Sequence, residues 1–497
     1  MIRFVLSSII MFFAIAASVN CQLTIDRTAW QIKDSADLLY LTEIELNTSH
    51  TSGAWRDVVA PQSETDYGAR VGGGAVVGDR LNLSGSFGYK YADRKKQCLS
   101  MLTFPNMFPF TVSDTIAGNQ TAELYQVAGN VLFTAVPSRL VLGADVAFLA
   151  SSTAKLRDLR NKNTFSQYCF SPSAKIIFDS FSVGLGWCYT PLAEEVLYSC
   201  FGSGNAFFAD KIEGLWFGER IVYSAPDFMT RRHSGDESRY CLSVNYLTDN
   251  LHMRGELSYY DAEYRLKLRD SEKRIGDVEK NGWRAKFSTA LSADRRHQFD
   301  AVYSVDNERS FVPIQQKQFS GTAYHYVQYG RVKRYSEKCV DFLDRYSYRT
   351  ETLSANACVS VNNIEKNVYL FPQVFRQNVS RLTFDAEADY KISFFKHKCL
   401  KNIKLALQCG YSSASGTMLK RQNPSAIDPN YYCNRQALEN QYNWLVSDYF
   451  KVAPRATFDI ALGRSVLSLS AAYDASIADG ASRSTISFAT VLHFSKN

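Results

Sequence analysis

The sequence predicts a transmembrane antiparallel β-barrel of about eighteen strands, within a range of about 16 to 20. Three observations lead to this prediction. Apolar and polar residues alternate along much of the chain, short turns alternate with long polar connections, and the chain opens with an export signal. An exported β-protein crosses hydrocarbon only by closing its sheet, because every backbone N–H and C=O must be paired there. The expected barrel has short periplasmic turns and long extracellular loops.

The N-terminal segment predicts export. The stretch "MIRFVLSSIIMFFAIAASVNCQ" places a positive charge at Arg3 ahead of an apolar run, which is the layout of a secretory signal peptide over residues 1–21. Cleavage after Cys21 leaves an N-terminal periplasmic segment at 22–37 and a barrel at 38–497. Acylation of Cys21, as in a lipoprotein, is the alternative. No later apolar stretch reaches the ~20 residues that a transmembrane helix needs.

Composition narrows the function classes. The formal net charge is +7, but acidic and basic residues are interspersed, so we expect no nucleic-acid partner. The 11 cysteines include no CxxC pair and do not cluster with histidine, so we expect neither a metal site nor a cofactor. Cys21 belongs to the expected signal peptide, and most of the other cysteines lie either in strand patterns or in segments that we interpret as loops. The strand group is Cys188, Cys241, Cys358 and Cys409, and the loop group is Cys98, Cys169, Cys200, Cys339 and Cys433.

Individual strands have one apolar and one polar face. Residues 81–91, 253–259, 283–291 and 299–305 all alternate in this way. A soluble sandwich or propeller is the alternative, but its strands are typically about 5–6 residues long with evenly short turns. The strands here approach ~10–14 residues, which favours a membrane barrel. In the clearest example, Leu382, Phe384, Ala386, Ala388, Tyr390, Ile392 and Phe394 face one way, and Arg381, Thr383, Asp385, Glu387, Asp389, Lys391 and Ser393 face the other.

The connections alternate between short and long. Eight tight turns supply sixteen strands, and a first strand at 40–49 and a last strand at 485–494 complete the count. The tight turns are expected at 77–80, 137–138, 179–182, 248–250, 292–296, 362–366, 397–401 and 463–464. Long polar connections are expected at 93–121, 193–235, 310–350 and 414–448. A short gap near 377–380 leaves the strand count open by two.

The chain ends on the alternating stretch "RSTISFATVLHF". Ile486, Phe488, Leu492 and Phe494 are expected to face lipid while this strand closes the barrel against 40–49. A last strand that ends on an aromatic residue resembles the signal that the barrel-assembly machinery reads. Outer-membrane lipid and this machinery are therefore expected partners.

Charged residues of both signs are candidates for the lumen. Asp385, Glu387 and Asp389 form an acidic ladder on one strand, which could bind a cation. The favoured interpretation is that these carboxylates pair with basic neighbours such as Lys404, Arg381 or Lys391. Two basic stretches, at 265–274 and 331–338, are either solvated loops or partners of lipid headgroup phosphates. The lumen-facing candidates are Asp385, Glu387, Asp389, Arg381, Lys391, Lys404, Arg455, Arg254 and Glu256.

Catalysis finds no support in the sequence. An outer-membrane hydrolase needs Ser with His and an orienting group, or paired acids with His. The 7 histidines are scattered and show no such arrangement. A TonB-dependent transporter is also not expected, because only about sixteen residues at 22–37 precede the first strand and leave no room for a plug domain.

Several motifs carry a family resemblance. They are Trp30 with the segment 34–38 and Gly53-Ala54-Trp55-Arg56, the stretch 108–131, and the loop "LRDLRNKN" with its following hairpin. With these motifs the chain resembles an uncharacterised outer-membrane β-barrel family of Bacteroidota. The resemblance implies an exported barrel, often encoded beside TonB-dependent receptors and surface lipoproteins, without a known substrate or catalytic residue. We expect a passive channel or an accessory component of a surface nutrient-uptake system, or alternatively a non-conducting docking barrel filled by its loops.

Overall fold

The computed structural model describes residues 42–494, except 202–205, 225–226, 270–272, 292–295, 322, 371–372, 395–399, 419–430 and 464. The described residues form one antiparallel sheet of 18 strands and a second sheet of 4 strands. The expected signal peptide, the Cys21 acylation site and the segment 22–37 lie outside the described residues.

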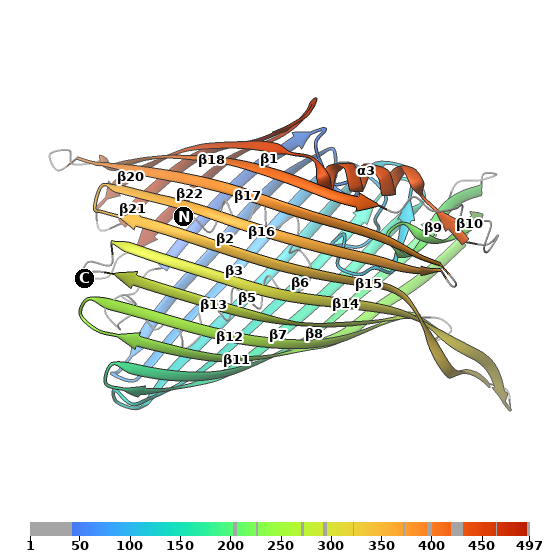
Figure 1. Ribbon diagram of the computed structural model, residues 1–497, viewed down its shortest axis with the longest axis horizontal. Coiled ribbons are helices and arrows are strands. Elements are labelled where there is room, and N and C mark those ends of the chain that lie inside the picture. The colour runs from blue at the N-terminus through green and yellow to red at the C-terminus, as the bar shows by residue number, and fades with distance from the viewer. Residues whose placement is uncertain are drawn as a thin grey trace.

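The large sheet confirms the predicted barrel. Figure 1 shows the tight turns at its left end and the long connections at its right end. Its strands are β1 (Thr42–Gly53), β2 (Ser63–Val77), β3 (Leu81–Gln97), β5 (Gly118–Val136), β6 (Leu140–Lys155), β7 (Arg160–Phe178), β8 (Phe181–Cys200), β11 (Asp227–Leu247), β12 (Leu251–Leu268), β13 (Arg274–Leu291), β14 (His297–Ser320), β15 (Ala323–Arg349), β16 (Leu353–Leu370), β17 (Gln373–Ser393), β18 (Leu400–Met418), β20 (Tyr449–Leu462), β21 (Ser465–Ala478) and β22 (Ala481–Phe494).

The last strand closes the barrel on the first. β1 pairs with β2 on one side and with β22 on the other, in a register that runs from Thr42 opposite Phe494 to Gly53 opposite Arg483. Both edges of the sheet are therefore hydrogen-bonded, as hydrocarbon requires. This pairing confirms the closing role predicted for "RSTISFATVLHF".

Apolar side chains cover the outside of the barrel. On β22, Ile486 and Phe488 are exposed, and on β17 the exposed residues Leu382 and Phe384 alternate with half-buried Asp385. A closed sheet with an apolar outer belt is a transmembrane barrel of the outer membrane. Within the described part of the chain, no helix is long and apolar enough to cross a membrane.

One predicted turn is wrong. The stretch 362–366 lies inside β16, and the connection between β15 and β16 is at 350–352. Asn362 and Asn363 are typical turn residues, but here each side chain forms a hydrogen bond with a side chain on a neighbouring strand. Asn362 donates to Asp341 on β15, and Asn363 accepts from Ser380 Oγ on β17 at 2.6 Å. The predicted number of strands is still correct, because the turn at 350–352 takes the place of the one predicted at 362–366.

The strands are longer than predicted, and several expected loops are strands. The stretch 310–350 forms most of the β14–β15 hairpin, and β17 runs without a break through 377–380, so the chain passes from β16 to β17 at 371–372, outside the described residues. Of the cysteines expected in loops, Cys169, Cys200 and Cys339 lie in barrel strands and Cys433 lies in the short β19. These segments form strands because neighbouring strands pair with their backbones, a context that local propensity does not reveal.

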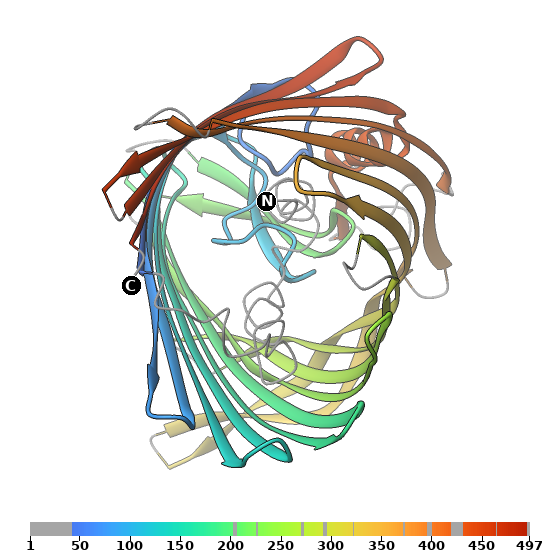
Figure 2. The same cartoon turned by 90° about the vertical axis from the view of Figure 1, so that its left-hand side faces the viewer.

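The second sheet lies inside the barrel. Its strands, in the order β19–β10–β9–β4, come from three different connections: β4 (Thr111–Asp114), the hairpin β9 (Ala206–Gly214) with β10 (Phe217–Ser224), and β19 (Tyr431–Cys433). The helix α3 (Arg435–Val446) follows β19, and the Asn434 side chain caps it by accepting from Ala437 N at 3.1 Å. Figure 2 shows these segments within the ring of strands.

Candidate functional site

Four connections at the long-loop end fold into the barrel, and we call them together the inner plug. They are residues 54–62, residues 98–117 with β4, the β9–β10 hairpin, and residues 431–446 with β19 and α3. Each comes from a long connection or from the link between β1 and β2. The chain's own loops thus occupy part of the lumen at this end.

The first packing layer joins residues 98–117 to the wall. Met107, Phe108 and Phe110 are buried and contact apolar side chains on the inner faces of β7, β8, β12 and β13. Gly276 on β13 makes room for one ring, since a Cβ there would lie 2.6 Å from Phe110 Cε2. Burial of each such side chain stabilises the layer by about 1.5–3 kcal/mol. The layer comprises Met101, Leu102, Met107, Phe108, Phe110, Val112, Leu149, Leu159, Phe165, Leu192, Val196, Tyr198, Cys200, Ala209, Ala262, Tyr264, Leu266, Ile275 and Val278.

The second packing layer joins the β9–β10 hairpin, α3 and the opposite wall. The Trp216 indole donates to Gln441 Oε1 on α3 at 2.8 Å, and the Phe217 ring lies 4.9 Å from the Phe375 ring on β17. Tyr335 on β15 packs against the hairpin turn, where Gly214 has a φ of +138° and no Cβ to block the ring. The two layers together contact walls that stretch from β6 to β17.

Buried polar contacts fix the plug in place. Lys155 at the end of β6 pairs with Asp114 of β4 and also donates to Ile116 O at 2.6 Å. The Glu194 carboxylate on β8 accepts from Thr103 N at 2.7 Å. Because unpaired charges are costly away from water, these contacts specify one position for residues 98–117.

The plug segments also bind one another. Asp57 accepts from Val59 N and from Asn106 Nδ2, each at 3.2 Å, and Gln97 Nε2 donates to Val59 O at 2.7 Å. Burial raises the pKa of the Asp57 carboxyl, although these hydrogen bonds oppose the shift. Burial likewise raises the pKa of Asp114, against the attraction of Lys155. The plug therefore holds these two carboxyl groups away from water.

One predicted lumen residue anchors the plug. The Arg381 guanidinium on β17 donates to Leu445 O at the end of α3 at 2.7 Å and to Ser412 Oγ on β18 at 2.9 Å. Trp55 completes this contact from the other side, with its indole donating to Ser447 Oγ at 2.9 Å. Sequence reasoning placed Arg381 in the lumen but did not connect it with a helix.

The other predicted charges line the inner face without converging on one site. Asp385, Glu387 and Asp389 follow one another on β17, with Lys391 next along the same face and Arg455 on the inner face of β20. Gln408 Nε2 lies 3.5 Å from Asp385 Oδ1, and Asn356 Nδ2 lies 3.5 Å from Glu387 Oε2.

The remaining three candidates, Lys404, Arg254 and Glu256, form ion pairs away from the acidic ladder. Lys404 makes its ion pair with Asp459 at 2.9 Å, and Arg254 pairs with Glu256 on its own strand at 3.2 Å. Lys404, on β18, thus pairs with a residue of β20 rather than with the acidic ladder on β17. Among the residues that the structure describes, no group of three or more His, Cys, Asp or Glu side chains could hold a metal ion.

The sequence allowed a loop-filled lumen as an alternative, but we identified no segment that enters it, although a signal for one was present. The stretch "MLTFPNMFPF" at 101–110 is largely apolar, yet it lies in a connection that was interpreted as a polar loop. A soluble protein surface seldom exposes so many large apolar side chains together. Such a run in an extracellular connection indicates that the connection folds back onto the barrel.

Comparisons with known proteins give one family match and several distant structural likenesses. A family model described as "Family of unknown function (DUF6850)" matches residues 36–494. No curated protein matches. Among solved structures, the outer membrane transporter YddB from Escherichia coli has a TM-score of 0.45 and 7% identity over 91% of this chain and 81% of that chain. The ferric citrate transporter FecA has a TM-score of 0.46 and 8% identity over 91% and 79% of the two chains. The ferric yersiniabactin uptake receptor FyuA from Yersinia pestis has a TM-score of 0.43 and 7% identity over 92% and 80%. At these identities and TM-scores, the likenesses carry no conclusion about what this chain binds or transports.

Proposed function

The chain belongs to a family of unknown function (DUF6850), and we propose that it is a non-conducting outer-membrane barrel that docks a partner in surface nutrient uptake. The observation that carries this proposal is the inner plug. Two apolar layers, a buried ion pair and buried hydrogen bonds join it to the wall, as expected for a permanent closure rather than for a mobile loop in an open pore. This favours the docking barrel over the passive channel.

The β14–β15 hairpin supports a docking role. The pairing of β14 with β13 ends at Phe311, and that of β15 with β16 begins at Tyr335, so residues 312–320 and 323–334 extend beyond the wall as a two-stranded ribbon. The Phe319 side chain is 73% exposed, and Tyr329 and Ile314 are exposed as well. This ribbon contains no Asp or Glu. Exposed aromatic residues and few carboxylates are typical of protein interfaces.

The partner we infer is a TonB-dependent receptor or a surface lipoprotein. The family resemblance described above implies such neighbours, and the ribbon would meet them above the membrane. Trimming the ribbon to a tight Asn-Gly turn should leave the barrel intact and abolish copurification of such a partner from native outer membranes. Equal partner recovery from both proteins would contradict the docking role.

Conductance tests the closed lumen separately. Purified protein in planar bilayers should give no steady current, whereas replacement of residues 98–117 by a short Gly-Ser linker should produce open-channel steps. Steady current from the unaltered protein would restore the passive channel. Silence from both proteins would show that residues 98–117 are not what closes the lumen.

A further inference from the structure

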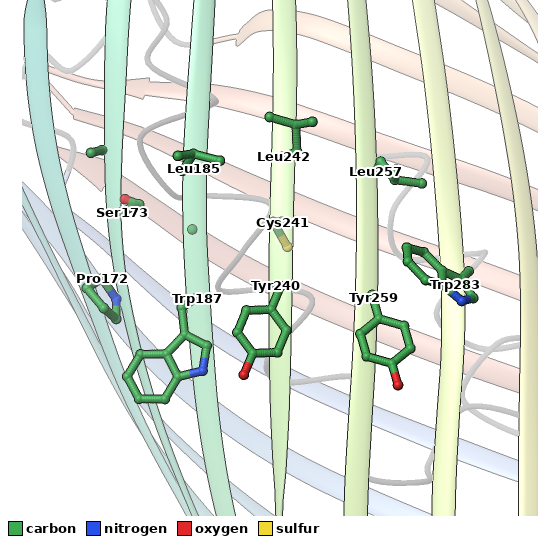
Figure 3. Close-up of a pocket in the computed structure, with 12 residues that line it drawn as sticks. Pro172, Ser173, Leu185, Trp187, Tyr240, Cys241, Leu242, Leu257, Tyr259 and Trp283 are labelled. Carbon is green, nitrogen blue, oxygen red and sulfur yellow. The ribbon is translucent and has the colours of Figure 1, made fainter.

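The lipid-facing wall is hollowed over β7, β8, β11, β12 and β13. Figure 3 shows this hollow, which has a volume of about 730 Å³. Its floor is formed on β7 by Pro172 and Ala174, two small outward side chains between the larger Phe170 and Ile176. Small residues at these places leave space that acyl chains can fill.

Two rows of side chains cross the hollow. The aromatic row is continuous from strand to strand, because Tyr240 lies opposite both Trp187 and Tyr259, and Tyr259 lies opposite Trp283. A second row, on the tight-turn side of the aromatic row, consists of Leu185, Leu242 and Leu257 on β8, β11 and β12. Aromatic residues mark the interface between headgroups and hydrocarbon, so the aromatic row gives the depth of the membrane surface.

A second, polar hollow of about 440 Å³ lies on the same strands toward the extracellular end. Its outward charged residues are Asp236 and Glu263, which face each other across β11 and β12, and Arg232 and Arg265 beyond them. Asp236 is four residues from Tyr240, about 13 Å at the rise of a β-strand. The polar hollow therefore begins at the level of lipid headgroups.

The order of the charges selects the ligand. Carboxylates lie next to the aromatic row and guanidinium groups lie farther out. The phosphate of a simple phosphoglyceride is separated from its acyl chains only by glycerol and would meet the carboxylates, which repel it. A sugar next to the acyl chains would instead donate its hydroxyls to Asp236 and Glu263, and a phosphate on its far side would reach Arg232 and Arg265.

We propose that this wall binds a phosphorylated glycolipid of the outer leaflet, with its acyl chains in the apolar hollow and its phosphosugar in the polar hollow. The Trp187 and Tyr240 rings lie at the level where the sugar meets the chains. The site is on the outside of the barrel, so it is independent of the inner plug and of the conducting state.

Native mass spectrometry of the whole protein in detergent tests this proposal with three probes: diphosphorylated lipid A, dephosphorylated lipid A and phosphatidylglycerol. The unaltered protein should retain diphosphorylated lipid A at least about tenfold better than either other lipid, given the strength of charge-assisted bonds to phosphate. Equal retention of the dephosphorylated probe, or of phosphatidylglycerol, would overturn the proposal.

Variants separate the two halves of the site. Arg232→Ala with Arg265→Ala should remove the preference for phosphate, whereas the outward Arg376→Ala on β17 should not. Ala174→Phe should fill the floor and lower retention of both lipid A forms, whereas Ala386→Phe on the outer face of β17 should not. Heat-modifiable migration checks that each variant is folded. Retention in either site variant equal to that of its matched control would refute the corresponding half of the site.

Discussion

Removing the Lys155 ammonium should loosen the inner plug. The Lys155 and Asp114 side chains are only 3% and 2% exposed, so they form an ion pair that water does not screen. Lys155→Met leaves Asp114 buried without its partner, which costs about 3–5 kcal/mol. This cost corresponds to a roughly hundred- to several-thousand-fold rise in the opening equilibrium of residues 98–117. The double change Lys155→Met and Asp114→Leu removes both charges and should recover most of the loss.

Hydrogen–deuterium exchange of the backbone amides in residues 98–117 measures this opening, and current bursts in planar bilayers report its effect on the lumen. The matched control is Lys95→Met, because Lys95 pairs with Asp93 at 2.7 Å but the two side chains are 49% and 32% exposed. Such an exposed pair contributes only about 0–1 kcal/mol. If exchange in Lys155→Met equals that in Lys95→Met, the buried pair does not hold the plug and the reasoning is refuted.

Three further predictions concern other parts of the molecule. Trp216→Ala should destabilise the second packing layer by about 3–5 kcal/mol, seen as faster exchange in β9, β10 and α3 but not in β21. Burial raises the pKa of Asp57 above its unfolded value of about 3.9, so the folded plug favours the neutral carboxyl. The resulting stability is fully present below pH ~3.9 and is lost as the pH rises through the pKa of the folded state. Exchange in the surrounding loop, corrected for its intrinsic rate, should thus increase from pH 4 to pH 7, and Asp57→Asn should abolish the increase; a pH-independent loop would contradict this. Phe488→Arg, on an outward side chain that is 54% exposed, should cost about 2–4 kcal/mol in urea unfolding, and Ser487→Arg on the lumen face should cost less.

Local pattern was sufficient to predict the barrel. Period-two alternation is a property of neighbouring residues, and the lipid requirement for a closed sheet turns a set of such strands into one architecture. The closing strand from Thr485 to Phe494 is the clearest case, since its apolar face and its place at the end of the chain already suggested a partner in the first strand. The turn at 362–366 failed because asparagine side chains form turns and cross-strand hydrogen bonds equally well, and only the neighbouring strands decide between the two.

The inner plug was decided by tertiary structure. Its parts come from connections that are far apart in the chain, and none of them forms a stable unit alone: β19 has three residues, and β4 has four. The hairpin strand β10 pairs with β19 across more than two hundred residues. Met107, Trp216 and Leu438 bury their side chains only because the barrel wall brings the connections to one place. Alternation along a strand therefore determined the wall of this protein, whereas the contents of its lumen depended on contacts that exist only after the wall has closed.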